Sequence, residues 1–314
     1  MEVNTGKGTG QGKVILIGDQ FVLFKVSAVL AALPYKTTCT VEIDSSVNGW
    51  TLEDNRMEVP GYKDQKKEDQ VNSFNTMIEE LGINLKKTPL KISLGGDLLA
   101  GSGVGASAAG CVAFVRACNE SFGMGLNDAG VNYFAWRGEF GYHGLPSGLD
   151  NTVSTYGGTI LYQLNEDKKK FDTLKLKKPV EVVMGNSGIT SNTASLKGFL
   201  EEQRETDPIL FEKRLKAIRV QVSQLRTALE AGDTDEVGNL MSENHRILID
   251  MGLSHPRLIE LCDTAVNLGA PGAKVTGGGR GGYMVALTPG KELQELVAAA
   301  FEERGISTIR GVIS

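Results

Sequence analysis

Residues 100–109 constrain this chain most, because three glycines at alternate positions, Gly101, Gly103 and Gly105, directly precede an apolar run. Glycine tolerates the backbone angles of a tight turn and lets amide groups approach a ligand with no Cβ in the way. The residues behind the turn recur at helical spacing: Ala108, Cys111, Val112, Val115 and Cys118. A glycine turn that opens a helix presents free N–H groups and a positive dipole end to an anion. The stretch therefore predicts a polyphosphate cradle made of Gly101, Ser102, Gly103, Gly105, Ala106, Ser107 and Ala108, with the Ser107 hydroxyl as a candidate magnesium ligand.

Two other nucleotide-binding motifs, the dinucleotide fingerprint and the Walker A loop, are also rich in glycine. Residues 103–108 formally match the relaxed dinucleotide fingerprint, but that fold needs an acidic strand end about 20 positions further on. The chain has a glycine-broken loop at 121–125 instead. A Walker A loop is excluded, because Gly12 and Lys13 are followed by Val14 and Lys7 stands where the motif has its first glycine. A glycine-rich loop without a ligand remains the alternative.

The bulk composition bounds the class of protein. A length of 314 residues favours two domains, which we place at 1–180 and 181–314. The net charge of −5 argues against nucleic acid as a partner. Four cysteines without a CxxC pair predict reduced core thiols. The first residues lack the apolar core of a signal peptide, and the longest apolar run, 21–33, carries Lys25, so we expect a cytoplasmic protein with no membrane contact.

The first half of the chain predicts a mixed sheet with helices. We expect a flexible lead-in at 6–12, strands at 14–17, 37–43 and 89–94, a short helix at 27–33 and an amphipathic helix at 69–81. A strand should return at 153–161, and the lysine-rich segment 168–178 is typical of a solvated hairpin.

The second half predicts an α/β plait. Strands are expected at 181–184 and 307–312, helices at 211–229, 235–251, 256–268 and 292–304, and a strand, glycine turn and strand at 272–287. The turn holds five glycines in six residues, more than a hairpin needs. It brings backbone close to a ligand or to the first glycine loop, unless it is a plain tight bend.

A second stretch of functional interest is 141–151, where Asp150 follows several turn-forming residues. A carboxylate positioned in this way commonly carries function, and the alternative is an aspartate that caps a turn. His143 is better explained as a structural hydrogen-bonding residue of the loop than as the catalyst. With three histidines and no HExxH pattern, a zinc site is not expected.

Three motifs stand in a recognisable order: Gly12-Lys13 with Gly18-Asp19-Gln20, then 103–109, then 274–282. This set resembles the GHMP kinases. Within that superfamily, residues 141–158 and Ser191-Asn192-Thr193 resemble the mevalonate kinases, closest to the trypanosomatid type. The likeness extends over nearly the whole chain.

The resemblance implies an α+β two-domain fold, with an N-terminal domain like ribosomal protein S5 domain 2 and a ferredoxin-like C-terminal domain, and an active site between them. It implies ATP and Mg²⁺ as cofactors and the primary hydroxyl of mevalonate as the acceptor, in isoprenoid precursor synthesis. Asp150 would be the catalytic base, Lys13 would hold that aspartate and stabilise the phosphoryl group, and Ser107 with Glu139 would bind magnesium. The substrate-binding set would be Lys13, Asp19, Gln20, His143, Ser147, Asp150 and Thr193.

The chain departs from the family pattern at several positions. Asp19 and Gln20 stand where the family usually has a Glu-His pair that contacts the substrate, and Lys25 replaces a glycine. These changes bear on the identity of the substrate more than on phosphoryl transfer. Two alternatives therefore stay open: a GHMP kinase for a different alcohol, or a catalytically weakened homologue that binds nucleotide. The partner is expected to be a small molecule, with a homodimer left open.

Overall fold

The computed structural model describes residues 5–165, 168–190 and 196–314. The chain forms two compact units. Unit 1 comprises Met1–Lys13, Pro34–Gly101 and Gly105–Gly157, and unit 2 comprises Val14–Leu33, Ser102–Val104 and Gly158–Ser314. Two long strands, β1 (Thr5–Ile17) and β2 (Ala28–Ile43), run from one unit into the other. The boundary that we place at residue 180 stays a prediction.

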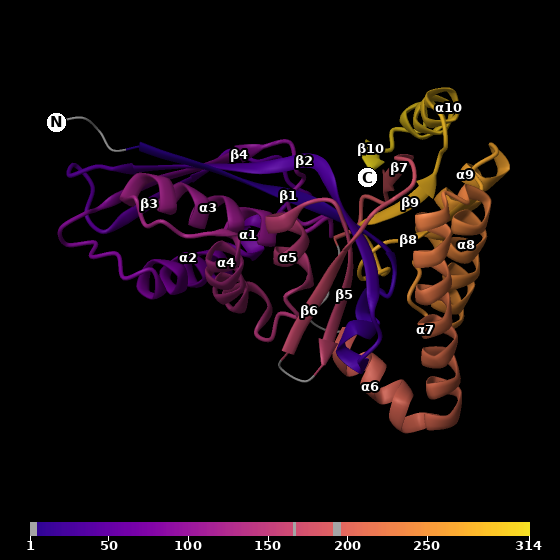
Figure 1. The fold of residues 1–314 in the computed structure, drawn as a ribbon. Helices are drawn as coiled ribbons and strands as arrows, with labels where there is room; N and C mark the ends of the chain where they lie inside the picture. The colour runs from indigo at the N-terminus through magenta and orange to yellow at the C-terminus, as the bar shows by residue number, and fades with distance from the viewer. Residues whose placement is uncertain (1–4, 166–167, 191–195) are drawn as a thin grey trace. The chain divides into compact units, whose positions relative to one another are not determined.

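Unit 1 packs helices against a sheet. The second half of β2 pairs antiparallel with β4 (Leu90–Gly96), and β3 (Trp50–Asp54) pairs parallel with β4. The helices are α1 (Tyr62–Gln65), α2 (Lys67–Glu80), α3 (Ala106–Phe122), α4 (Asp128–His143) and α5 (Leu149–Tyr156). Figure 1 shows α2, α3 and α4 gathered on one side of these strands. The core between them includes the fully buried side chains of Phe74, Met77 and Phe114, as their apolar spacing requires.

The glycine-rich start of the chain is a strand, so the prediction of a flexible lead-in was wrong. Gly6, Gly8 and Gly10 lie on one face of β1, against α3. A Cβ at these glycines would fall 2.0 to 2.2 Å from backbone oxygens of the helix, those of Ala117, Ala113 and Ala109. Glycine at every second position therefore lets the helix backbone lie directly on the strand.

Two further predictions were wrong in the type of element. Residues 27–33 are not a helix, because Ala28 to Leu33 form the start of β2 with every side chain buried. A short, fully apolar run does not distinguish a buried strand from a buried helix. The segment 153–161 is divided between α5 and the strand β5 (Thr159–Asn165), so only its end is a strand.

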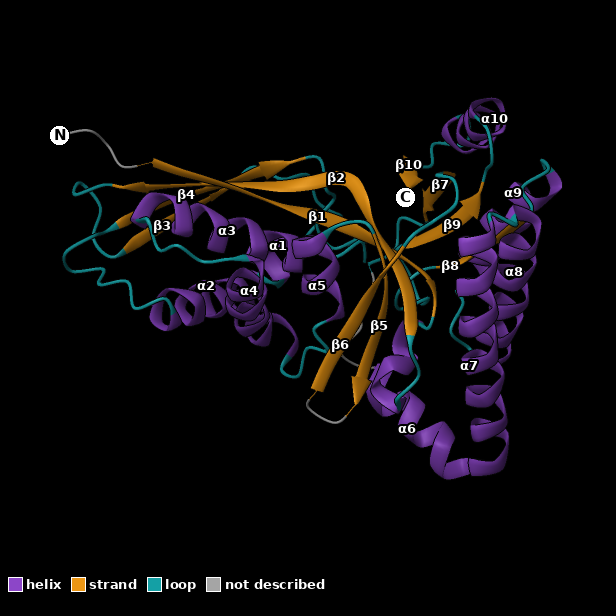
Figure 2. Cartoon of the chain, in the orientation of Figure 1, coloured by secondary structure: helices purple, strands orange, loops and turns teal. Residues whose placement is uncertain are grey.

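Unit 2 contains the predicted plait. Its four-stranded antiparallel sheet has the order β10-β7-β9-β8, built from β7 (Val180–Asn186), β8 (Gly272–Val275), β9 (Tyr283–Leu287) and β10 (Thr308–Ile313). The helices are α6 (Leu196–Thr206), α7 (Pro208–Ala231), α8 (Thr234–Asp250), α9 (Pro256–Asn267) and α10 (Lys291–Glu302). This order of strands is that of a ferredoxin-like domain, and Figure 2 shows the long helices α7 and α8 side by side.

Unit 2 also holds the first half of β2, which pairs with β5, and β5 pairs in turn with β6 (Lys168–Leu174). A short 3₁₀ helix, η1 (Asp19–Phe24), follows β1. The stripe of apolar residues predicted on α7 is buried from Phe211 to Leu229, so it belongs to the core. All four cysteines are buried and free, as predicted. Among the described residues, no helix is both long and apolar enough to cross a membrane.

Candidate active site

The glycine loop has the geometry of an anion cradle. Gly101, Gly103 and Gly105 have φ angles of 84°, 83° and 78°, values that glycine adopts without strain. Gly105 is the N-cap of α3, and no side chain caps the free N–H groups of the first turn. A Cβ at Gly105 would lie 3.0 Å from Cγ of Lys13, so the loop also closes tightly on that side chain. The amides of the first turn are thus available to a phosphate.

Lys13 and Asp150 form an ion pair in unit 1. Nζ of Lys13 lies 3.5 Å from Oδ1 of Asp150; the lysine side chain is buried and the aspartate side chain is about one third exposed. Asp150 follows the turn-forming residues, as expected, and lies in the first turn of α5, behind the N-cap Gly148. The positive end of the helix dipole and the buried ammonium both stabilise a carboxylate there. The arrangement gives a partly exposed carboxylate held by a buried ammonium.

Glu139, Ser107 and His143 form a second cluster of unit 1. Glu139 is buried on α4, and its carboxylate accepts a hydrogen bond from the Ser107 side chain. Nε2 of His143 lies 3.7 Å from Oε2 of Glu139 and 3.4 Å from the Ser107 hydroxyl. Burial and the charge of Asp150 raise the pKa of Glu139, whereas His143 and the hydrogen bonds oppose this shift. The cluster holds two hard oxygen donors near the mouth of the glycine loop.

These two donors fit magnesium. Mg²⁺ is usually bound by one or two carboxylates together with phosphate oxygens and waters, and not by a cage of protein ligands. In the part of the chain that the structure describes, no three His, Cys, Asp or Glu side chains group in a way that suits a metal ion. The Ser107 hydroxyl and the Glu139 carboxylate therefore suit an ion that arrives with a nucleotide.

The loop between α4 and α5 is fixed by local hydrogen bonds. The indole N–H of Trp136 donates to the Pro146 carbonyl at 3.0 Å, and the Ser147 hydroxyl accepts from the Leu149 amide at 3.4 Å. Ser147 thus supports the start of α5, which carries Asp150. His143 is exposed and is the last residue of α4.

Asp19 and Gln20 belong to unit 2. Asp19 is buried in η1 with a φ of 30°, and its two carboxylate oxygens accept hydrogen bonds from Nζ of Lys274 at 2.8 Å and from the Gly277 amide at 3.1 Å. Lys274 is fully buried. Gln20 is half-buried. The ion pair of Asp19 with Lys274 was missed, because in the motif at 274–282 only the glycines were interpreted.

The second glycine turn is packed by backbone within unit 2. The Ile15 amide donates to the Thr276 hydroxyl at 2.8 Å. A Cβ at Gly279 would fall 1.9 Å from the Leu253 carbonyl oxygen, and one at Gly281 would fall 2.8 Å from that of Ile189. Close backbone packing inside this unit thus explains why positions 279 and 281 are glycine. Thr193, which the resemblance places in the substrate-binding set, lies outside the described residues.

Comparisons with known proteins match both halves of the chain. The GHMP kinases N terminal domain matches residues 71–158, and the GHMP kinases C terminal domain matches residues 225–307. Mevalonate kinase of Pyrococcus furiosus is 31% identical over 307 residues, which cover 91% of this chain and 90% of that protein.

Solved structures give the same answer. A crystal structure of L. major mevalonate kinase in complex with R-mevalonate has 35% identity and a TM-score of 0.93, and the match covers 98% of this chain and 96% of that one. Lactococcus lactis galactokinase, at 17% identity and a TM-score of 0.75 over 98% of this chain and 93% of that one, shares the fold. The chain therefore belongs to the GHMP kinases and, within them, to the mevalonate kinase family.

Proposed function

We propose that this protein transfers the γ-phosphoryl group of ATP to the primary hydroxyl of mevalonate and so forms 5-phosphomevalonate, with Mg²⁺ as cofactor. The observation that carries the proposal is the pairing of Lys13 with Asp150 in the same unit as the uncapped start of α3, in a chain so similar to mevalonate kinases. Transfer to an alcohol needs a base, charge neutralisation and alignment, which these residues supply.

Asp150 is the proposed base. Its carboxylate accepts the proton of the attacking hydroxyl while the oxygen forms its bond to phosphorus and the bond to ADP breaks. Lys13, at 3.5 Å, keeps the carboxylate in place and stabilises negative charge on the transferred group. Both groups are anchored in secondary structure, Lys13 within β1 and Asp150 in the first turn of α5, which favours precise alignment.

The cofactor-binding residues are proposed to be Gly101, Ser102, Gly103, Gly105, Ala106, Ser107 and Ala108, whose backbone would hold the phosphates at the start of α3. Ser107 and Glu139 would bind magnesium, and the ion would neutralise phosphate charge.

The remaining members of the substrate-binding set are proposed to be Asp19, Gln20, His143, Ser147 and Thr193. Because both carboxylate oxygens of Asp19 already accept hydrogen bonds, we expect Gln20 to make the more direct contact of the two. The proposal also includes a cytoplasmic location, no nucleic acid or membrane partner, and a domain boundary at residue 180. It leaves a homodimer open.

A kinase for a different alcohol is the second candidate. It is favoured by one observation, the Asp19-Gln20 pair, since a glutamine side chain cannot carry the positive charge that a histidine offers to a substrate carboxylate. A weakened homologue that only binds nucleotide is disfavoured by Lys13, Ser107, Glu139 and Asp150, because the chain retains all four.

An assay of coupled ADP release over a panel of small alcohols tests the proposal. Mevalonate should be the preferred acceptor, and a preference for an uncharged alcohol would replace it with the second candidate. Asp150→Asn should lower turnover by about two to four orders of magnitude while nucleotide binding survives. Near-normal turnover of the folded variant would refute the role of Asp150.

A further inference from the structure

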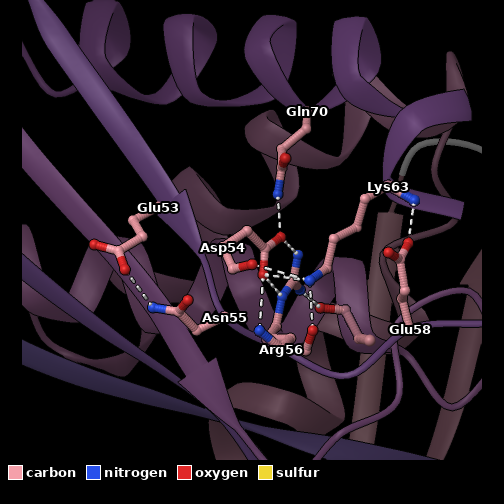
Figure 3. A network of polar contacts seen from close by, with 8 residues as sticks. Glu53, Asp54, Asn55, Arg56, Glu58, Lys63 and Gln70 are labelled. Atoms are coloured by element: carbon pink, nitrogen blue, oxygen red, sulfur yellow. Dashed lines mark hydrogen bonds and ion pairs between the residues drawn. The ribbon is translucent and has the colours of Figure 1, made fainter.

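Arg56 is a buried cation of unit 1 that the proposed mechanism does not use. It follows β3, with 5% of its surface exposed. Asp54 binds its guanidinium through two hydrogen bonds, from Nε to Oδ1 at 2.9 Å and from Nη2 to Oδ2 at 2.6 Å. Figure 3 shows this pair at the centre of a network of polar side chains. Such a two-point contact fixes the plane of the guanidinium as well as its position.

The remaining nitrogen of the guanidinium, Nη1, donates to the carbonyl oxygen of Ala106 at 3.0 Å. Ala106 is the first residue of α3, directly behind the glycine loop. Gly110 leaves room for this contact, because a Cβ there would lie 3.3 Å from Nη1. A cation at a helix N-terminus opposes the helix dipole, so helix stability alone does not favour this arrangement. Asp54 offsets the positive charge of Arg56, so the guanidinium contributes a fixed hydrogen bond to the Ala106 carbonyl there rather than net charge.

The chain that carries Arg56 also holds the other end of the glycine loop. The Ala100 amide donates to the Met57 carbonyl, and the Val59 amide donates to the Ala100 carbonyl, both at 2.9 Å. The Tyr62 ring packs on Gly101, where a Cβ would fall 2.5 Å from the ring. Residues 56–62 thus contact the chain on both sides of the loop.

The side chains of Lys63 and Gln70 also hold residues 54–58 in place. Nζ of Lys63 donates to the carbonyl oxygens of Asp54 and Arg56, and the Lys63 amide donates to the Glu58 carboxylate at 2.6 Å. The Gln70 amide on α2 donates to Asp54 at 2.9 Å. The Asp54 carboxylate that orients Arg56 is therefore itself contacted by Lys63 and Gln70.

We propose that Arg56, oriented by Asp54, is a positioning residue for the polyphosphate of the nucleotide. It fixes the first turn of α3, and with it the free amides and the Ser107 hydroxyl. This role rests on the proposed function only in that the nucleotide is ATP, and it does not depend on which alcohol is the acceptor. Calorimetric titration with Mg-ATP in the absence of an acceptor therefore tests the role of Arg56 separately from the choice of substrate.

The first test compares Arg56→Met with Arg116→Met. Arg116 is a matched control, since it lies toward the far end of the same helix and also pairs with an aspartate and donates to backbone carbonyls. Arg56→Met should raise the Kd for Mg-ATP roughly tenfold and leave the Kd for mevalonate unchanged. Arg56→Lys, which keeps the charge without the two-point contact, should lie between wild type and Arg56→Met. Arg116→Met should leave both Kd values unchanged.

A second variant keeps the test valid if Arg56→Met does not fold. Gly110→Ala places a methyl group 3.3 Å from Nη1 of Arg56, so the guanidinium shifts by a few tenths of an ångström and its hydrogen bond to Ala106 lengthens, while the pair with Asp54 remains. Alanine favours the helix over glycine, so stability should hold or rise. The Kd for Mg-ATP should nevertheless rise, on the order of threefold.

Several outcomes would overturn the proposal. One is a wild-type Kd for Mg-ATP in folded Arg56→Met or in Gly110→Ala. Another is an equal loss of ATP and mevalonate binding in Arg56→Met, which would indicate general loosening of the unit. A wild-type protein that binds ATP but prefers another alcohol refutes only the choice of substrate, whereas one that does not bind ATP refutes both proposals.

Discussion

Removal of the Lys274 ammonium should destabilise unit 2 more than removal of any exposed lysine. Lys274 and Asp19 have side-chain exposures of 0% and 2%, and their charged atoms lie 2.8 Å apart. Lys274 and the Gly277 amide both donate hydrogen bonds to the Asp19 carboxylate. In Lys274→Met the carboxylate stays buried and keeps, of these two, only the bond from the Gly277 amide. Loss of one member of a buried pair typically costs about 3 to 5 kcal/mol, because the partner stays desolvated without compensation. Out of a total stability of about 5 to 15 kcal/mol, this is a large loss.

The assay is urea unfolding of four proteins: wild type, Lys274→Met, Asp19→Asn and the double variant. Asparagine suits position 19, because it tolerates positive φ better than most residues. The double variant removes both charges, so it should lose less free energy of unfolding than the sum of the two single losses, by about 1 to 3 kcal/mol. Lys291→Met is the control. Its side chain is 72% exposed although it lies 2.8 Å from Glu295, and an exposed pair contributes at most about 1 kcal/mol.

The reasoning fails if Lys274→Met costs no more than Lys291→Met. It also fails if the losses of the two single variants simply add in the double variant, since additivity would mean that the two charges do not interact.

Three further predictions concern other residues. Glu139→Gln should raise the magnesium concentration needed for half-maximal activity without lowering stability, because burial already disfavours its carboxylate; superimposable magnesium titrations would make Glu139 structural. Gln20→His should lower the KM for mevalonate with little change in kcat, as the contact is made in the ground and transition states alike, and a raised KM would contradict this. Burial lowers the pKa of His245 to about 4, so the folded state stays neutral where the unfolded state takes up a proton. The free energy of unfolding should therefore fall by about 3 kcal/mol through His245 as the pH drops from about 6.5 to about 4. His245→Gln should reduce the slope of the free energy of unfolding against pH in this range, and equal slopes in the two proteins would refute the prediction.

Local patterns determined the elements that depend on neighbours in the sequence. The glycine loop at 101–105 and the helix behind it follow from glycine conformation and apolar spacing, and both are in the structure. The stripe from Phe211 to Leu229 predicted α7, and the order of elements in the second half predicted the plait. Each of these patterns lies within one element or in the order of the elements along the chain. It could therefore be interpreted without knowing any contact between distant residues.

The errors arose where distant packing decides the local structure. The glycines at 6, 8 and 10 have the composition of a flexible segment, and they form a strand because α3 lies directly on them. The run at 27–33 is apolar on both faces, which fits helix and strand equally until the sheet is formed. For Asp150, the turn-forming residues before it were recognised, but the helix α5 that begins there was not.

The contacts that build the candidate site come only from the tertiary structure. Lys13 and Asp150 were paired by resemblance, whereas their distance of 3.5 Å depends on how β1 and α5 pack. Asp19 meets Lys274 across 255 positions, and Arg56 reaches the Ala106 carbonyl across 50. A buried charge is stable only beside a partner, and the sequence shows the charge without showing which residue burial brings beside it. Sequence thus determined which chemical groups the protein has, and packing decided which of them act together.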